Sequence, residues 1–511
     1  MIMSRTLYEW FAAAVDRHGG EPALEAGTDR LTYRQLSDLA DRVAGELVAA
    51  HGAVPRRVGL LAERSVLAYA GYLAVQRLGS TVVPLNPSFP AARTTAVAFA
   101  GELDIVLVEG DTDAAAALPV PALPLTREAT APVAPLPAYA GDADAIAYIL
   151  FTSGSTGAPK GVPIRHRNVS AYLDHIVPRY AMGPGSRASQ TFDLTFDLSV
   201  FDMFASWGSG ATLVVPGRDD LMAPARFVAA KELTHWFSVP SVVSVARRLR
   251  SLAPGSMPTL RWSLFCGEPL TLQQAEAWRA AAPGSRVENL YGPTELTISC
   301  TEYRLPADPA DWPRPANGTV PIGTPYPGLE HVVLDPEGLP SEDGELCVRG
   351  AQRFPGYLDP ANDAGRFVVY DGVRAQAFDG SGPVTDDLWY RTGDRVTRQH
   401  GQLVHLGRLD QQVKVRGYRV ELGEIEAALR DQPGVRDALV VALPGADGES
   451  DLEAVCTGAD PAPERLLAAL RLRLPSYMVP RGVTVYDELP LNTNGKVDRK
   501  TVTAEIAAQY A

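Results

Sequence analysis

The chain has 511 residues, and because a single hydrophobic core rarely grows beyond about 250–300 residues, we expect at least two domains. The formal net charge is −13 and no run is rich in lysine and arginine, so nucleic acid is not expected as a partner. No stretch approaches the roughly 20 apolar residues of a membrane span, and residues 1–20 lack the apolar segment of a signal peptide. The four cysteines are scattered without C-x-x-C spacing, which argues against a disulfide framework or a thiolate zinc site and fits a reducing cytoplasm.

The predicted elements of the N-terminal part alternate between helix and strand. Apolar residues from Leu7 to Val15 recur at helical spacing and predict an amphipathic helix. Further along, two apolar strands at 57–61 and 81–84 are separated by a helical pattern, which is typical of a βαβ unit. The alanine- and proline-rich segment 114–140 is expected to be an irregular surface connection that leads into a strand at 145–151.

The pattern changes after residue 406, where Gly-Arg-Leu-Asp is followed by closely alternating charged and apolar residues. We therefore expect an α/β chain with a large N-terminal domain of layered α/β subdomains, residues 1–409, and a small C-terminal α+β domain, residues 410–511. The small domain should contain strands at 412–416, 435–441 and 452–457 and helices at 423–430 and 464–474.

A loop of glycines and hydroxylated residues, Thr-Ser-Gly-Ser-Thr-Gly-Ala-Pro-Lys-Gly, directly follows the strand at 145–151. Glycines permit close backbone approach, hydroxyl and N–H groups donate to phosphate oxygens, and a lysine adds positive charge. The loop is not a Walker A motif, because Pro159 precedes Lys160 and Gly161 follows it. A flexible linker is the alternative interpretation, but linkers rarely follow a buried strand. The residues expected to contact phosphate are Thr152, Ser153, Gly154, Ser155, Thr156, Gly157 and Lys160.

Other motifs occur along nearly the whole chain, and with this loop they resemble those of the adenylate-forming superfamily. That superfamily includes acyl-CoA synthetases, luciferases and the adenylation domains of nonribosomal peptide synthetases. The resemblance implies an AMP-forming acid–thiol ligase that uses ATP and Mg²⁺. It also implies a small domain that rotates about a hinge at Asp410, although on local grounds Asp410 could be a turn or capping residue. The segments that carry it include Phe196-Asp197-Leu198-Ser199, Asn289-Leu290-Tyr291-Gly292-Pro293-Thr294-Glu295, Tyr390-Arg391-Thr392-Gly393-Asp394, Arg416-Gly417-Tyr418-Arg419 and Asn494-Gly495-Lys496.

The reaction that the resemblance implies brings a carboxylate and a phosphate together, so the site must neutralise negative charge with cations and a metal. By resemblance, Glu295 would hold Mg²⁺, Thr294 would contact phosphate, and Lys496 would bridge the substrate carboxylate and the α-phosphate. Taken alone, the segment around Lys496 is typical of a solvated turn. Tyr291 would stack on adenine and Asp394 would accept hydrogen bonds from the ribose. The implied nucleotide contacts also include Gly267, Glu268, Pro269, Asn289, Leu290, Gly292 and Arg408.

Asp197 matches the family position that pairs with the ammonium group of an amino acid, although on local grounds it could equally be a helix N-cap. The remaining specificity positions match Leu198, Phe201, Ser238, Leu264, Cys266, Leu290, Ile298 and Ser299. This set has no lysine, arginine or second acid, so we expect a neutral side chain of small to medium size. Segments 234–240 and 263–269 are similar to stand-alone adenylation enzymes of macrolactam pathways, which implies a β-amino acid, with an α-amino acid as the alternative.

The thiol acceptor is expected to be a separate molecule, because the printed chain ends at Ala511 without the Gly-Gly-x-Ser segment of a fused carrier domain. The resemblance implies the phosphopantetheine thiol of a discrete carrier protein in trans. An acyl-CoA ligase that uses coenzyme A would share every nucleotide motif and is the alternative. An aminoacyl-tRNA synthetase is disfavoured, because His-Ile-Gly-His and Lys-Met-Ser-Lys-Ser are absent and the charge is acidic. A non-catalytic relative would be expected to lack Lys496 or Glu295, and both are present.

Overall fold

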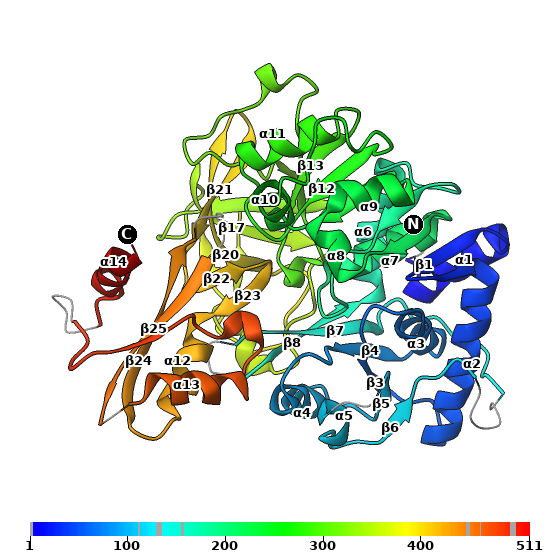
Figure 1. The fold of residues 1–511 in the computed structure, drawn as a ribbon, viewed down its shortest axis with the longest axis horizontal. Helices are drawn as coiled ribbons and strands as arrows, with labels where there is room; N and C mark the ends of the chain where they lie inside the picture. Colours follow the sequence, from blue (N-terminus) through cyan, green and yellow to red (C-terminus); the bar gives the residue numbers. More distant parts are fainter. Residues whose placement is uncertain are drawn as a thin grey trace.

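The computed structural model describes residues 4–110, 113–128, 135–154, 158–445, 450–459, 461–490 and 497–510. Figure 1 shows a large N-terminal body of mixed helices and strands, coloured blue to yellow, and a small C-terminal part in orange and red. The expected α/β class, with a large N-terminal and a small C-terminal domain, is confirmed. No helix in the described ranges is long and apolar enough to cross a membrane.

The βαβ unit predicted in the N-terminal part is present. Strand β3 (Arg57–Leu61) pairs in parallel with β4 (Thr81–Leu85), and helix α3 (Val66–Arg77) connects them. The six-stranded sheet has the order β6-β5-β3-β4-β7-β8, in which the last pair is antiparallel. The other strands of this sheet are β5 (Ile105–Val108), β6 (Ala122–Pro124), β7 (Ile146–Thr152) and β8 (Lys160–Arg165).

The expectation of a wholly irregular segment at 114–140 is wrong in part. A short helix, α5 (Asp113–Ala116), begins there, and β6 adds an edge strand to the sheet by pairing in parallel with β5. A strand of three residues is too short to show alternation in the sequence, so its pairing with β5 is a tertiary effect.

The second sheet of the large domain positions most of the predicted site. Its order among the described strands is β15-β14-β13-β12-β11-β9-β10-β1-β2. Strands β11 (His235–Ser238), β12 (Trp262–Phe265) and β13 (Arg286–Tyr291) are parallel, so their carboxyl ends lie at one edge, where open α/β sheets bind ligands. The remaining strands are β1 (Pro22–Ala26), β2 (Asp29–Thr32), β9 (Arg187–Ser189), β10 (Thr212–Val215), β14 (Thr301–Arg304) and β15 (Thr324–Pro325).

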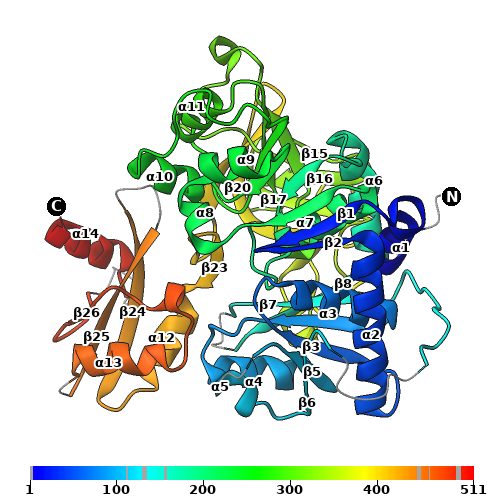
Figure 2. The ribbon, with the colours of Figure 1, turned by 45° about the vertical axis from the view of Figure 1, so that its right-hand side comes forward.

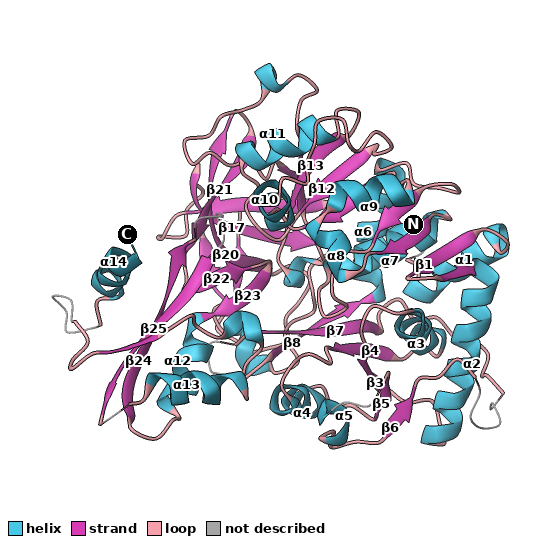
Figure 3. Cartoon of the chain, in the orientation of Figure 1, coloured by secondary structure: helices cyan, strands magenta, loops and turns pink. Residues whose placement is uncertain are grey.

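Helices pack against these two sheets, as Figure 3 shows. The predicted N-terminal helix is α1 (Leu7–His18), which buries Leu7, Trp10 and Phe11 and begins at a capping box on Thr6. The other helices of the large domain are α2 (Tyr33–His51), α4 (Ala91–Ala100), α6 (His166–Arg179), α7 (Leu198–Ser209), α8 (Arg218–Met222), α9 (Pro224–Lys231), α10 (Ser241–Arg248) and α11 (Leu272–Ala281).

A third, largely antiparallel sheet leads towards the small domain. Within it β17 pairs with β20, and β20 pairs with β21, whose last residue is Arg408. Its strands are β16 (Leu329–Leu334), β17 (Asp343–Gly350), β18 (Phe367–Tyr370), β19 (Ala375–Ala377), β20 (Trp389–Gln399) and β21 (Gln402–Arg408).

The small C-terminal part begins with a hairpin, and only the first of its two strands is predicted from the sequence. The predicted first strand is β22 (Gln412–Val415), and it pairs with an unpredicted β23 (Tyr418–Glu421) across a turn at Gly417. Figure 2 shows β23 between the large body and the rest of the small one. The elements that follow are α12 (Leu422–Arg430), β24 (Val435–Pro444), β25 (Ser450–Gly458), α13 (Pro463–Arg471), β26 (Val483–Val485) and α14 (Arg499–Tyr510). The division at residue 409 itself stays a prediction.

Candidate active site

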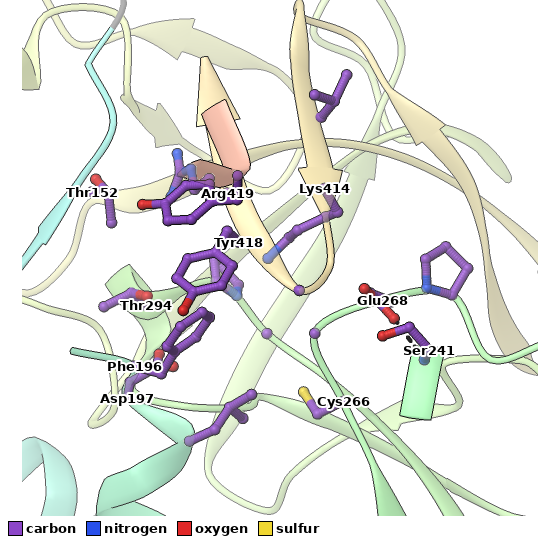
Figure 4. Close-up of a pocket in the computed structure, with 18 of the residues that line it drawn as sticks. Thr152, Phe196, Asp197, Ser241, Cys266, Glu268, Thr294, Lys414, Tyr418 and Arg419 are labelled. Atoms are coloured by element: carbon purple, nitrogen blue, oxygen red, sulfur yellow. Dashed lines mark hydrogen bonds between the residues drawn. The ribbon is translucent and has the colours of Figure 1, made fainter. Parts of the chain in front are cut away.

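One cavity of about 930 Å³ lies at the carboxyl ends of β11, β12 and β13, and residues of the β22–β23 hairpin line its other side (Figure 4). Its volume is typical of a small-molecule site, which is ~300–1,000 Å³. The cavity brings most of the predicted contacts together, although they come from distant segments. The predicted site residues that line it are Thr152, Ser153, Asp197, Leu198, Cys266, Gly267, Glu268, Pro269, Asn289, Leu290, Tyr291, Gly292, Thr294, Ile298, Asp394 and Arg408.

Asp394, on β20, is the centre of a hydrogen-bond network on the cavity wall. Its carboxylate accepts from the Tyr291 hydroxyl at 2.6 Å and from Arg408 Nη1 at 3.1 Å, and it lies 3.0 Å from His405 Nε2. Burial opposes its ionisation, but the hydrogen bond from His405 and the charge of Arg408 outweigh burial and lower the pKa of Asp394 to about 2. The carboxylate is therefore an ionised acceptor, which is suited to the hydroxyl groups of a ribose.

Asn289 offers a buried acceptor beside Tyr291. Its Nδ2 donates to the carbonyl oxygens of Val320 at 3.2 Å and Pro321 at 3.0 Å, whereas Oδ1 is buried and has no partner among the described residues. A buried acceptor without a donor is costly, and the exocyclic amino group of adenine is a donor of matching chemistry. A Cβ on neighbouring Gly292 would lie 2.5 Å from Ser299 Cα, so glycine is needed for this close backbone approach. The Oδ1 atom of Asn289 is therefore suited to accept from the amino group of an adenine nucleotide.

Asp197 directly precedes α7, but its carboxylate makes no side-chain capping bond. The N-cap interpretation therefore does not explain the acidic group. The residue is 7% exposed, and burial raises its pKa to about 6, against the opposing effects of a hydrogen bond from Thr294 and the charge of Lys414. An acid held in so poorly solvated a place lacks a full counter-charge and is suited to receive a cation.

The wall next to Asp197 is apolar and partly strained. Cys266, Leu290 and Ile298 are at most 1% exposed, and burial raises the pKa of the Cys266 thiol to about 12. Thr297 and Ile298 have φ values of 59° and 74°, which are rare for β-branched residues. Strain of this kind persists only where surrounding contacts hold it, and it is frequent at ligand sites.

Four predicted specificity residues do not line the cavity but are buried elsewhere: Phe201, Ser238, Leu264 and Ser299. The hydroxyls of the two serines are already engaged within the protein. Ser238 Oγ accepts from Trp236 Nε1 at 2.9 Å and donates to the Val239 carbonyl at 3.1 Å. Ser299 Oγ lies 2.7 Å from the Tyr326 hydroxyl.

Lys414 is a charged residue of the cavity wall that the predicted specificity positions do not include. It extends from β22 into the cavity, as Figure 4 shows, and it has no hydrogen-bond or ion-pair partner for its ammonium group in the described part of the chain. Burial lowers its pKa, as does the charge of Arg419, whereas Cys266 and Asp197 act in the opposite sense. The family-derived positions missed it because it belongs to the small domain.

The hairpin and helix α12 also contact the predicted phosphate loop. Ser153 Oγ donates to the Arg419 carbonyl at 2.8 Å and accepts from Glu421 N–H at 3.0 Å. Gly154 N–H donates to Glu424 Oε2 at 3.2 Å, and the other oxygen of Glu424 accepts from Arg93 at 2.7 Å in a buried ion pair. Lys160 is buried at the start of β8 and does not line the cavity, while Ser155, Thr156 and Gly157 lie outside the described residues.

Glu295, the predicted metal ligand, is paired with a protein cation. Arg419 Nη1 donates to its two oxygens at 2.8 and 2.9 Å, and the Tyr357 hydroxyl donates to Oε1 at 2.6 Å. Burial opposes ionisation, but the charge of Arg419 outweighs it and lowers the pKa of Glu295 to about 2. No cluster of metal-binding side chains is formed elsewhere in the described residues either. In this orientation of the hairpin, Glu295 therefore does not offer a free carboxylate to Mg²⁺.

Two further predicted residues are not among the described residues that line the cavity. Asp410 binds Arg408 through two hydrogen bonds, at 2.7 Å to Nε and 2.6 Å to Nη2, directly between β21 and β22. Lys496 lies outside the described residues, so its position relative to the cavity stays a prediction. Arg419 and Tyr418 also contact the site, although the motif at 416–419 indicates no role for either from sequence alone. The ring of Tyr418 stacks on Tyr477 with centroids 3.7 Å apart.

Comparisons with known proteins agree with this geometry. The family described as AMP-binding enzyme matches residues 11–358, and the AMP-binding enzyme C-terminal domain matches residues 424–496. The chain is 35% identical over 531 residues to the phosphinothricin tripeptide synthetase PhsC of Streptomyces viridochromogenes, covering 98% of this chain and 45% of PhsC. It thus spans less than half the length of that relative.

Two solved structures are similar over the whole chain. The crystal structure of IdnL7 is 38% identical, with 100% of both chains covered and a TM-score of 0.69. The adenylation domain AlmE of Vibrio cholerae, solved with glycyl-adenosine-5′-phosphate, is 29% identical, with 99% of both chains covered and a TM-score of 0.80. With motifs, fold and family matches in agreement, the chain belongs to the AMP-binding enzyme family and is an ATP-dependent, AMP-forming ligase of the nonribosomal peptide synthetase adenylation type.

Proposed function

We propose that this enzyme activates a small neutral amino acid as an aminoacyl-adenylate and then transfers the acyl group to the phosphopantetheine thiol of a carrier protein in trans. In the first step a carboxylate oxygen attacks the α-phosphorus of ATP, and pyrophosphate leaves with the electron pair of the broken bond. The observation that carries the amino-acid part is the buried Asp197 carboxylate in the same cavity as Asn289, Tyr291 and Asp394. An acid without an amine would leave that carboxylate unpaired, which is unfavourable in a desolvated site.

The proposed substrate is a β-amino acid with a short side chain. The narrower choice rests on the resemblance of segments 234–240 and 263–269 to β-amino-acid enzymes, and the apolar wall of Cys266, Leu290 and Ile298 supports a short neutral side chain. Lys414 suggests one exception to a neutral side chain that can be tested. Its ammonium group lies in the cavity and could pair with a second carboxylate on the substrate.

The test is amino-acid-dependent pyrophosphate exchange with 3-aminobutyrate, β-alanine, alanine, valine and 3-methylaspartate at equal concentrations. We expect 3-aminobutyrate to be preferred. Preference for alanine or valine would contradict the β-amino-acid assignment and leave the ligase assignment intact, and preference for 3-methylaspartate would assign Lys414 to a second carboxylate. Butyrate, which lacks an amine, is tested alongside these five, and exchange with butyrate alone would contradict the proposal as a whole.

Mg²⁺ is proposed to bind Glu295 only when Arg419 has withdrawn from it. A carboxylate is the type of ligand that Mg²⁺ prefers, but both oxygens now accept from Arg419. Lys496 is proposed to approach the α-phosphate in that same alternative orientation, in which the small domain turns about Asp410.

A further inference from the structure

Helix α10 (Ser241–Arg248) connects the interior of the cavity with the surface. Ser241, Ser244, Arg247 and Arg248 all line the cavity, and their spacing of three or four residues places them along one face of the helix. Ser241 is 7% exposed, whereas Arg247 and Arg248 are exposed. The helix therefore runs outward along the cavity wall for ~10 Å, at ~1.5 Å per residue.

The inner half of α10 is held rigidly by its neighbours. Ser241 N–H donates to Glu268 Oε2 at 2.9 Å, a bond drawn in Figure 4. Gln274 Nε2 donates to Ser244 Oγ at 3.0 Å and to the Pro240 carbonyl at 3.2 Å. The two arginines thus project from a fixed support, which is what a binding site needs for a defined geometry.

The outer end of α10 is unusually basic for this chain. The protein carries a net charge of −13, yet Arg247, Arg248 and Arg250 lie within four consecutive residues. The side chain of Arg247 has no hydrogen-bond or ion-pair partner among the residues that the structure describes. Cations are favourable at a helix C-terminus, but that effect does not account for Arg247 lining the cavity without a partner among the described residues.

We propose that Arg247 and Arg248 bind the phosphate at the outer end of the 4′-phosphopantetheine arm, so that the arm enters the cavity along α10. This inference rests on the proposed function, because it supplies the route by which the thiol reaches the aminoacyl-adenylate. The phosphate is the one ionised group of the arm, and guanidinium groups recognise phosphate by charge-assisted hydrogen bonds. The rest of the arm is uncharged and can pass the Ser241 and Ser244 positions on the same helix face.

The step that this arrangement serves balances without any further reactant. The thiol sulfur attacks the carbonyl carbon of the aminoacyl-adenylate, and a carbon–sulfur bond forms. The bond between that carbon and the phosphate oxygen breaks, AMP leaves with its electron pair, and the thiol proton passes to solvent. Arg247 and Arg248 take no part in the bond changes and act by positioning the acceptor.

The experiment compares two thiols that differ only in the phosphate, pantetheine and 4′-phosphopantetheine. Transfer from preformed aminoacyl-adenylate is measured as kcat/KM for each thiol, and the ratio is taken within each variant, so differences in the amount of folded enzyme cancel. We expect the wild type to prefer 4′-phosphopantetheine by ~10-fold, mainly through KM, and the preference to shrink with added salt. In Arg247→Gln and in the double variant Arg247→Gln/Arg248→Gln, the ratio should approach one.

Arg226→Gln is the matched control, because Arg226 is exposed on neighbouring α9 and does not line the cavity. It should keep the wild-type ratio. Equal use of both thiols by the wild type, or a preference that survives the double variant, would overturn the inference while leaving the proposed transfer intact. Failure of both thiols to accept the acyl group would instead overturn the proposed function and this inference with it.

Discussion

Arg419 and Glu295 form a buried ion pair between the small domain and the large one, with Nη1 2.8 and 2.9 Å from the two carboxylate oxygens. Glu295 is fully buried and Arg419 is largely buried, so neither charge is well solvated. The Glu295 carboxylate cannot accept both hydrogen bonds from Arg419 and also bind a metal ion with the same oxygens. The pair therefore links the orientation of the hairpin to the state of the phosphate site.

The first prediction follows from this pair. Arg419→Gln should destabilise the orientation of the hairpin in which Arg419 pairs with Glu295, because removing one partner of a buried pair typically costs ~3–5 kcal/mol. We expect acyl transfer from preformed aminoacyl-adenylate to slow by ~10-fold or more. Single-turnover transfer measures this directly. Arg481→Gln, which removes a surface pair with Asp451, is the control and should behave as wild type. An equal loss in pyrophosphate exchange would show that the pair does not act on one half-reaction.

The second prediction concerns Lys496. Replacing it with alanine should lower adenylation by ~10²-fold or more, the size of effect seen when a preorganised charge partner is lost. Transfer from preformed adenylate should fall far less, and Lys500→Ala serves as a control on a nearby exposed lysine. If both half-reactions dropped to the same extent, the assignment of Lys496 to adenylation would be wrong.

The third prediction concerns the hinge. Asp410→Pro fixes φ at the connection between β21 and β22, so the small domain should be held in the adenylating orientation and should not reach the one in which Arg419 pairs with Glu295. Adenylation should then survive and thioester formation should collapse. Asp410→Ala separates this effect from loss of the two hydrogen bonds to Arg408, because it removes the carboxylate without fixing the backbone. Retention of both activities in the proline variant would remove Asp410 from the hinge.

The fourth prediction concerns substrate affinity at Asp197. Asp197→Asn should weaken amino-acid activation by ~10²-fold or more, since the substrate ammonium would lose its charged partner in a desolvated site. The KM for ATP should change little. Parallel pyrophosphate-exchange titrations of the two substrates measure both effects, and an equal rise in the two KM values would contradict the role.

The fifth prediction is a pH dependence of stability in the substrate-free enzyme. Burial raises the pKa of Asp197 from 3.8, its ordinary value in an unfolded chain, to about 6 in the folded protein. Between these two pH values the unfolded chain releases the proton more readily than the folded protein does. The free energy of unfolding therefore falls as pH rises from 3.8 towards 6. Asp197→Asn should therefore be more stable than wild type above pH ~6, by a difference on the order of 3 kcal/mol, and the difference should vanish near pH ~4. Urea unfolding across this pH range checks it, and a difference that is constant with pH would contradict it.

The sequence predicts the elements whose pattern is local. The βαβ unit of β3 and β4 and the helices α1 and α12 are visible from apolar periodicity, and the motif residues Tyr291 and Asp394 meet in the cavity as the family order implies. The contacts of the hairpin could not be predicted in this way. Arg93 and Glu424 pair across 331 residues, and nothing in the neighbourhood of either residue indicates the other.

Lys414 and the outer end of α10 show the same limit. In sequence, Lys414 is one charged residue in an alternating strand, and Arg247 and Arg248 are typical of a helix C-terminus. Lys414 lines the cavity only because the β22–β23 hairpin covers it. Arg247 and Arg248 line it because α10 follows β11, whose carboxyl end lies at the edge of the cavity. Tertiary placement, which periodicity does not encode, decides what these side chains do.

All four cysteines are buried, and burial raises the thiol pKa of each of them. Reaction with alkylating reagents requires an accessible thiolate, so the native protein should label slowly at all four positions. A cysteine introduced at exposed Arg226 on the large domain and another at exposed Arg471 on the small one would then carry fluorophores selectively in the otherwise unaltered sequence. The unlabelled native cysteines therefore make the protein suitable for distance measurements across the proposed hinge at Asp410 during a single turnover.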